Sequence, residues 1–190
     1  MRLIDTGRSV YHALRRLPER VRHRGRRRAA LARQSAAGRP QRVLILCYGN
    51  ICRSPYAEAR LRRLLDERGW RDTIVESAGF IGAGRPANDS ARRLARSRGL
   101  DLGGHRSRIV DPALVSRASL LLVMTAEQVI AAEREAGASP RKFEILGDFD
   151  PEGIPQRDIP DPYGQRTEVF ERVFDRIDRC LASLVGEWNT

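Results

Sequence analysis

The segment that is most informative about the fold is Arg42-Val-Leu-Ile-Leu-Cys-Tyr-Gly-Asn-Ile-Cys-Arg-Ser-Pro55. Its first half is an unbroken apolar run, which predicts a strand that is buried on both faces of a sheet. Its second half is a short loop that leads into a helix from about Pro55 to Arg68, because proline favours the start of a helix and Gly69 favours its end. A strand, a loop and a helix are therefore predicted in immediate succession.

Strand-like and helix-like segments alternate through the rest of the chain. This alternation predicts an α/β fold, in which a four-stranded parallel sheet carries helices on both faces. We expect strands over 42–47, 73–77, 119–124 and 143–146, and helices over 55–68, 89–98, 126–136 and 167–185.

The positive charge of the chain is concentrated at its beginning. The 190 residues carry a formal net charge of +11, and residues 1–42 contain 13 arginines against two acidic residues, Asp5 and Glu19. The remaining 148 residues hold 22 basic and 22 acidic groups. We therefore divide the chain into a basic extension, 1–41, and a neutral domain, 42–190. A neutral domain argues against nucleic acid as the partner of the core.

The extension is expected to be flexible or partly helical. Val10, Leu14, Leu17 and Val21 have the spacing of one helix face, whereas the small residues of 34–40 indicate a linker. Several interpretations stay open: a loosely ordered tail, a start placed too far upstream, a targeting peptide, or an anchor for an anionic membrane or an acidic partner. No uninterrupted apolar core follows the charges, which argues against a secretory signal.

The cysteines favour a reducing compartment and no metal. Only Cys47, Cys52 and Cys180 are present, an odd and small number that predicts no disulfide framework and a cytoplasmic location. The three histidines are scattered and no second cysteine pair has zinc spacing, so we predict neither a metal nor a cofactor. No run of apolar residues is long enough to span a membrane.

The loop after the first strand has the composition of an anion site. Open α/β sheets bind ligands at the carboxyl ends of their strands, where Cys47 lies. Gly49 and Asn50 tolerate a left-handed backbone, which turns successive N–H groups inward, and the Arg53 fork grips two phosphate oxygens. The same surroundings favour the thiolate form of Cys47. The predicted phosphate-binding residues are Tyr48, Gly49, Asn50, Ile51, Cys52, Arg53 and Ser54.

From residue 42 to about 185 the sequence resembles the low-molecular-weight protein tyrosine phosphatase family. The resemblance covers essentially everything except the extension, and it rests on several motifs together. These motifs are the stretch 43–58, Glu76-Ser-Ala-Gly79, the stretch 99–108, Leu146-Gly-Asp-Phe-Asp-Pro151 and Ile159-Pro-Asp-Pro-Tyr-Gly164.

The resemblance implies a role for each matching residue. Cys47 would be the nucleophile that forms a phosphocysteine, and Arg53 with the loop N–H groups would hold the phosphoryl oxygens. Asp161 would protonate the leaving phenolate and then serve as base for the attacking water. The residues that would fix the loop are Asn50, Ser54, Ser77 and His105. The implied partner is a phosphotyrosine-containing protein, for example a bacterial tyrosine kinase.

Substrate selection and redox behaviour are less directly implied. Many members of this family have an aromatic wall after the second strand, but the matching segment here, 80–86, is shorter. We expect Phe80 or Ile81 to replace that wall, together with Tyr48, Ile51 and Tyr163. The resemblance also implies that Cys52 traps oxidised Cys47 as a disulfide, whereas the helical spacing of Cys180 predicts a core position.

Rival functions differ at identifiable residues. A protein arginine phosphatase on the same scaffold typically has threonine where this chain has Ile51. A thiol-coupled arsenate reductase needs further resolving cysteines and has no use for Asp161. A basic nucleic-acid-binding or membrane-surface protein would be a non-enzymatic alternative. Because every motif residue lies beyond residue 41, removal of 1–40 is expected to leave activity on a small aryl phosphate nearly unchanged. The physiological substrate and the oligomeric state are left open by the sequence.

Overall fold

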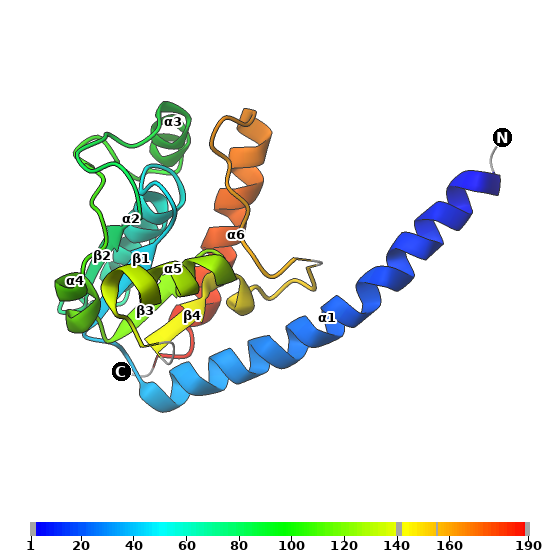
Figure 1. Cartoon of the computed structure of the whole chain (residues 1–190), viewed down its shortest axis with the longest axis horizontal. Coiled ribbons are helices and arrows are strands. Elements are labelled where there is room, and N and C mark those ends of the chain that lie inside the picture. Colours follow the sequence, from blue (N-terminus) through cyan, green and yellow to red (C-terminus); the bar gives the residue numbers. More distant parts are fainter. Residues whose placement is uncertain (1–2, 140–141, 155, 189–190) are drawn as a thin grey trace.

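The predicted four-stranded parallel sheet is confirmed. The computed structural model describes residues 3–139, 142–154 and 156–188, with side chains from Glu19 onward. All strands run parallel, in the order β2-β1-β3-β4 (Figure 1). Their bounds are Arg42–Leu46 for β1, Ile74–Ala78 for β2, Leu120–Val123 for β3 and Phe143–Ile145 for β4.

Helices cover both faces of the sheet, and successive side chains of its strands pack alternately into an apolar cluster on each face. Val43 and Ile45 of β1 pack into the cluster that contains α2 and α6, whereas Leu44 and Leu46 pack into the cluster that contains α4 and α5. Such burial on both faces explains the unbroken apolar run of this strand. The helices on the first face are α2 (Arg53–Asp66), α3 (Asp89–Ser97) and α6 (Thr167–Val185); those on the second are α4 (Pro112–Arg117) and α5 (Ala126–Ala136).

Two short elements were not predicted. Helix α4 has six residues, too few for a helical period, although Asp111 and Pro112 are an N-cap signal: Asp111 Oδ1 accepts a hydrogen bond of 2.7 Å from Leu114 N. The other is η2 (Leu146–Phe149), a 3₁₀ turn directly after β4. Helix α2 begins two residues before Pro55, because proline fits anywhere in the first turn of a helix, where no N–H partner is needed.

The N-terminal extension is one helix, α1 (Leu3–Ala37), which differs from the partly helical segment expected. It continues through the first part of the predicted linker. Figure 1 shows its first half projecting away from the domain. Its second half contacts α6 through Arg27, whose Nη2 donates to Ser183 Oγ at 3.0 Å. In its second half Ala30 is fully buried and His23 is 2% exposed, so this half is docked on the domain.

Of the predicted apolar stripe of the extension, the structure describes one side chain, Val21, and this side chain does not take part in the docking. Val21 is 64% exposed, and Val10, Leu14 and Leu17 lie outside the residues whose side chains are described. Within the described ranges, no helix combines the length and the apolar character needed to cross a membrane.

Candidate active site

The loop between β1 and α2 turns its carbonyl groups outward. Four successive carbonyls accept hydrogen bonds from donors outside the loop, two of them side chains and two of them backbone N–H groups. The pairs are Tyr48 O with Phe80 N at 2.8 Å, Gly49 O with Arg85 Nη2 at 2.8 Å, Asn50 O with His105 Nε2 at 2.7 Å, and Ile51 O with Asn88 N at 2.8 Å.

The loop N–H groups are consequently left for a ligand. Across the described part of the chain, no backbone N–H of residues 48–52 donates to a protein acceptor. Asn50 has a φ of 50°, and among the described residues it is the one non-glycine residue with a positive φ. A left-handed residue within a run of inward N–H groups makes a concave anion site. Of the two residues expected to tolerate a left-handed backbone, Asn50 adopts it, whereas Gly49 is absent from the residues with a positive φ.

A chain of hydrogen bonds runs from Cys47 into the interior. Asn50 Nδ2 donates to Ser54 Oγ at 2.8 Å and to Ser77 Oγ at 2.9 Å. Because Ser54 Oγ already accepts from Asn50, its own proton is available to Cys47 Sγ, 2.9 Å away. Ser77 in turn donates to Glu58 Oε2 at 2.5 Å. The predicted supporting residues Asn50, Ser54 and Ser77 thus form one network behind the thiol, and His105 joins it through the Asn50 carbonyl.

Arg53 and Asp161 meet beside the loop although 108 residues separate them. Arg53 Nη2 donates to Asp161 Oδ2, and Arg53 Nη1 donates to Ile159 O at 3.0 Å. Arg53 is 3% exposed, and its buried Nε–H has no partner among the described residues. A buried donor without a partner is destabilising, so this N–H is suited to a bound oxyanion.

Cys47, Asp161 and the loop line one cavity of about 260 Å³. Ile51, Ile81, Tyr48 and Tyr163 supply most of its apolar wall, as expected for four of the five proposed slot residues. The complete lining is Cys47, Tyr48, Gly49, Ile51, Cys52, Ile81, Arg85, Asp161 and Tyr163.

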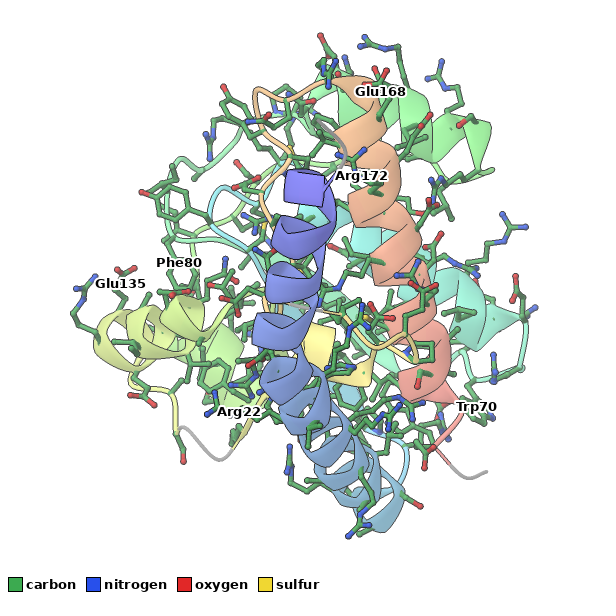
Figure 2. The ribbon with its side chains drawn as sticks, turned by 90° about the vertical axis from the view of Figure 1, so that its right-hand side faces the viewer. Arg22, Trp70, Phe80, Glu135, Glu168 and Arg172 are labelled. Atoms are coloured by element: carbon green, nitrogen blue, oxygen red, sulfur yellow. The ribbon has the colours of Figure 1, made fainter. Side chains whose placement is uncertain are left out.

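Two residues of the 80–86 segment differ from expectation. Phe80 does not line this cavity: it packs against the α4–α5 cluster and lines a neighbouring groove with Glu135 of α5, so Ile81 forms the wall instead (Figure 2). Arg85 was not anticipated, because nothing in the sequence distinguishes it from the other arginines. Its guanidinium holds the carbonyls of Gly49, Ile81 and Gly82 and so ties the segment to the loop.

The other two thiols lie in apolar surroundings. Burial, followed by the negative charges of Cys47 and Asp161, raises the pKa of Cys52 to about 12. Cys180 is fully buried on α6, which confirms the predicted core position, and burial raises its pKa as well. Within the described residues, no three His, Cys, Asp or Glu side chains are grouped closely enough to hold a metal ion.

Comparison with known proteins places this loop in a family. A model of the low molecular weight phosphotyrosine protein phosphatases matches residues 42–189. The chain belongs to this family. The probable low molecular weight protein-tyrosine-phosphatase EpsP of Ralstonia nicotianae is 38% identical over 145 residues, which are 75% of this chain and 92% of the relative.

Solved structures of this phosphatase family superpose on the domain. Wzb of Escherichia coli K30 in complex with sulphate matches with a TM-score of 0.66 and 34% identity, over 76% of this chain and 95% of that one. Vibrio vulnificus Wzb in complex with benzylphosphonate matches with a TM-score of 0.66 and 33% identity, over 75% and 94%. The family match begins at residue 42, so it includes every residue of the candidate site and leaves α1 outside.

Proposed function

We propose that this phosphatase hydrolyses phosphotyrosine in proteins through a phosphocysteine intermediate on Cys47. The observation that carries the proposal is the single cavity in which Cys47, Asp161 and the inward N–H groups meet an apolar wall. Its anion-binding floor suits the phosphoryl group, and its wall suits an aromatic ring. The proposal is also supported by the bound ligand of the Vibrio vulnificus relative, since benzylphosphonate joins a phosphonate to a ring.

In the first step the Cys47 thiolate attacks phosphorus and the bond to the phenolic oxygen breaks. Asp161, protonated, gives its proton to the departing oxygen, so that tyrosine leaves neutral and Asp161 becomes a carboxylate. The loop N–H groups and Arg53 stabilise the equatorial oxygens during transfer. In the free protein the Arg53 guanidinium is paired with Asp161. When substrate binds, its phosphoryl oxygens replace Asp161 as acceptors of the Arg53 N–H groups.

In the second step water cleaves the phosphocysteine. The Asp161 carboxylate accepts a proton from water as its oxygen attacks phosphorus, and the sulfur departs as thiolate. Ser54 Oγ, 2.9 Å from Cys47 Sγ, donates to the sulfur and stabilises the negative charge that returns there. Phosphate is released, Asp161 is again protonated, and the enzyme is ready for another turnover.

The cavity wall favours a phenyl ring over a guanidinium. Ile51 and Ile81 are apolar and offer no acceptor to the N–H donors of phosphoarginine, which would be desolvated without partners. The arsenate reductase alternative has little support, because Cys180 is buried in the core far along the chain from the loop. These residues therefore favour phosphotyrosine.

One comparison tests this proposal directly. Hydrolysis of phosphotyrosine, phosphoserine and phosphoarginine peptides is measured for the wild type and for Cys47→Ser. We expect turnover of the phosphotyrosine peptide only, and none with Cys47→Ser, because an alcohol is a far weaker nucleophile at neutral pH. Retained turnover by Cys47→Ser, or a preference for phosphoarginine, would remove the assignment.

The proposal extends to partners and location. A tyrosine-phosphorylated protein of the cytoplasm, such as a tyrosine kinase, is the expected substrate, and the relatives from Ralstonia nicotianae and Escherichia coli K12 that carry phosphatase names are bacterial. The basic extension is expected to contact an anionic membrane surface. Arg20, Arg24 and Arg28 are exposed on α1, and the side chain of Arg22 is 72% exposed (Figure 2). Sedimentation with phosphatidylserine vesicles checks this contact, which should weaken as salt is raised.

A further inference from the structure

We propose that Arg26 and His23 of α1 are positioning residues for the segment that carries Asp161. The inference rests on the proposed role of Asp161 as general acid. It concerns a part of the chain that lies outside the family match, which begins at residue 42. The N-terminal helix would thus be a support of the active site, although none of the α1 side chains that the structure describes lines the cavity at Cys47.

Two contacts of α1 are with the start of the acid-bearing segment, which is the stretch 146–161 that leads from η2 to Asp161. Arg26 Nε donates to Asp148 Oδ1 at 3.2 Å, and the side chain of Asp148 is only 2% exposed. The ring of His23 is buried, and its Nε2 lies 2.9 Å from the carbonyl oxygen of Asp150. A carbonyl only accepts, so Nε2 carries the proton of this bond.

Two arginines relay these contacts toward Asp161. Arg157 binds the same Asp148 carboxylate, with Nε at 2.9 Å from Oδ1 and Nη2 at 2.6 Å from Oδ2. Arg176 of α6 donates from Nε to Asp150 Oδ2 at 3.1 Å. Its two terminal nitrogens hold three successive carbonyls, those of Gln156 at 2.7 Å, Arg157 at 3.0 Å and Asp158 at 2.7 Å.

The segment has little room to shift against these anchors. Gly147 packs so closely on it that a Cβ at that position would lie 1.9 Å from Arg157 O. Beyond Asp158 the chain is fixed again, because Ile159 N donates to Met124 O at 2.9 Å and Ile159 O accepts from Arg53. Asp161 follows two residues later. We therefore expect a displacement of Asp148 or Asp150 to move Asp161 as well, because the residues between them are held by these contacts.

Burial makes the α1 contacts important. Asp148 is 1% exposed, so its carboxylate depends on its cationic partners, Arg26 of α1 and Arg157. Removing one partner of a buried charge leaves that charge poorly compensated, and the surrounding structure moves to compensate it. Without Arg26, the groups left to move are Asp148 and its remaining partner Arg157, which belongs to the acid-bearing segment.

The helix itself supplies a matched control. Arg27, the next residue, donates from Nη2 to Ser183 Oγ of α6 at 3.0 Å and has no hydrogen bond to the acid-bearing segment among the described residues. Loss of Arg27 therefore removes an arginine that docks α1 at one neighbouring position, without touching Asp148. An effect caused only by weaker docking of α1 would be shared by both variants.

The test uses the full chain and the variants Arg26→Ala, Arg26→Lys, Arg27→Ala and Asp161→Asn. Values of kcat/KM are measured for phenyl phosphate, a poor leaving group, and for 2,4-dinitrophenyl phosphate, a good one. We expect Arg26→Ala to lower kcat/KM for phenyl phosphate by about tenfold to a hundredfold, the effect of a misplaced catalytic group, and to change the good substrate little. Arg26→Lys, which keeps the cation, should recover part of this loss, and Arg27→Ala should affect both substrates equally.

Amide hydrogen exchange over residues 156–161 gives a second readout that does not depend on catalysis. We expect faster exchange there in Arg26→Ala than in Arg27→Ala. Equal kinetics and equal exchange in the two variants would overturn the inference. If Asp161→Asn lowers kcat/KM by the same factor for phenyl phosphate and for 2,4-dinitrophenyl phosphate, the general-acid proposal fails. The hydrogen-exchange comparison alone then decides whether α1 positions the segment. If Arg26→Ala does not fold, Arg26→Lys and Arg27→Ala are compared in the same two measurements.

Discussion

Gly79→Ala is predicted to distort the phosphate-binding loop from behind. Gly79 follows β2 directly and lies against the start of the loop. A Cβ at this position would be 2.8 Å from Asn50 N, 2.8 Å from Tyr48 O and 2.9 Å from Cys47 O. All three are backbone atoms, so no side chain can rotate away. Gly79 is also held in place by Val110 N, which donates to its carbonyl at 2.7 Å.

The size of the effect follows from these distances. Ordinary van der Waals contacts of a Cβ begin at 3.4 Å, so the methyl group needs the loop or β2 to move by about 0.6 Å from the nearest atoms at 2.8 Å. Catalytic groups must be held within about 0.5 Å of their productive geometry. Loss of a single oxyanion donor lowers kcat by about 10²–10³-fold, so we expect a loss of at least about 10²-fold. Overpacking of this kind also destabilises by about 1–3 kcal/mol.

The assay compares Gly79→Ala with Gly153→Ala, since a Cβ at Gly153 would meet nothing within 4 Å. Values of kcat/KM on an aryl phosphate, the inhibition constant of inorganic phosphate and the melting temperature are measured for both. Gly79→Ala should bind phosphate more weakly and melt lower by about 2–4 °C per kcal/mol lost, whereas Gly153→Ala should match the wild type. Wild-type phosphate affinity in a folded Gly79→Ala protein would refute the steric argument.

Four further predictions follow from the site and from α1. Asp161→Asn should lower the inhibition constant of inorganic phosphate by up to about fivefold. The reason is that the half-exposed Arg53–Asp161 ion pair, worth up to about 1 kcal/mol, no longer competes with phosphate for the Arg53 guanidinium. An unchanged inhibition constant would show that the ion pair does not compete. Ile51→Thr should shift the ratio of kcat/KM values toward phosphoarginine by about 1–3 kcal/mol, since its hydroxyl accepts a hydrogen bond, and an unmoved ratio would place the selectivity elsewhere. After peroxide treatment, the activity that a thiol reductant restores should depend on a disulfide between Cys47 and Cys52. This recoverable activity should increase with pH, because a pKa of about 12 leaves Cys52 almost entirely as the less reactive thiol at neutral pH. Full recovery of activity in Cys52→Ala would contradict this prediction. Removal of residues 1–40 should lower kcat/KM for phenyl phosphate, contrary to the expectation from motif positions alone, and a fully active truncated enzyme would count against a positioning role for α1.

The four strands, the helices α2, α3, α5 and α6, and the composition of the loop followed from the sequence alone. The apolar run 43–46 required a strand buried on both faces, and its place before Pro55 required a helix to follow. Asn50 was expected to tolerate a left-handed backbone from its residue type alone, and its φ is 50°. The long periodic segment 167–185 was predicted to the residue, because nineteen residues of helical spacing leave little ambiguity.

Only the tertiary structure decided which distant groups meet. Arg85 resembles every other arginine in the sequence, and its role depends on three carbonyls that converge around one guanidinium. Phe80 and Ile81 are adjacent apolar residues, and the path of the backbone alone turns one toward the α4–α5 cluster and the other toward the cavity. The basic composition of the extension predicts charge but no docking site. The buried carboxylate of Asp148, which lies 122 residues away from Arg26, is one of the groups that anchor α1 to the domain, because a buried charge requires a partner wherever in the chain that partner lies.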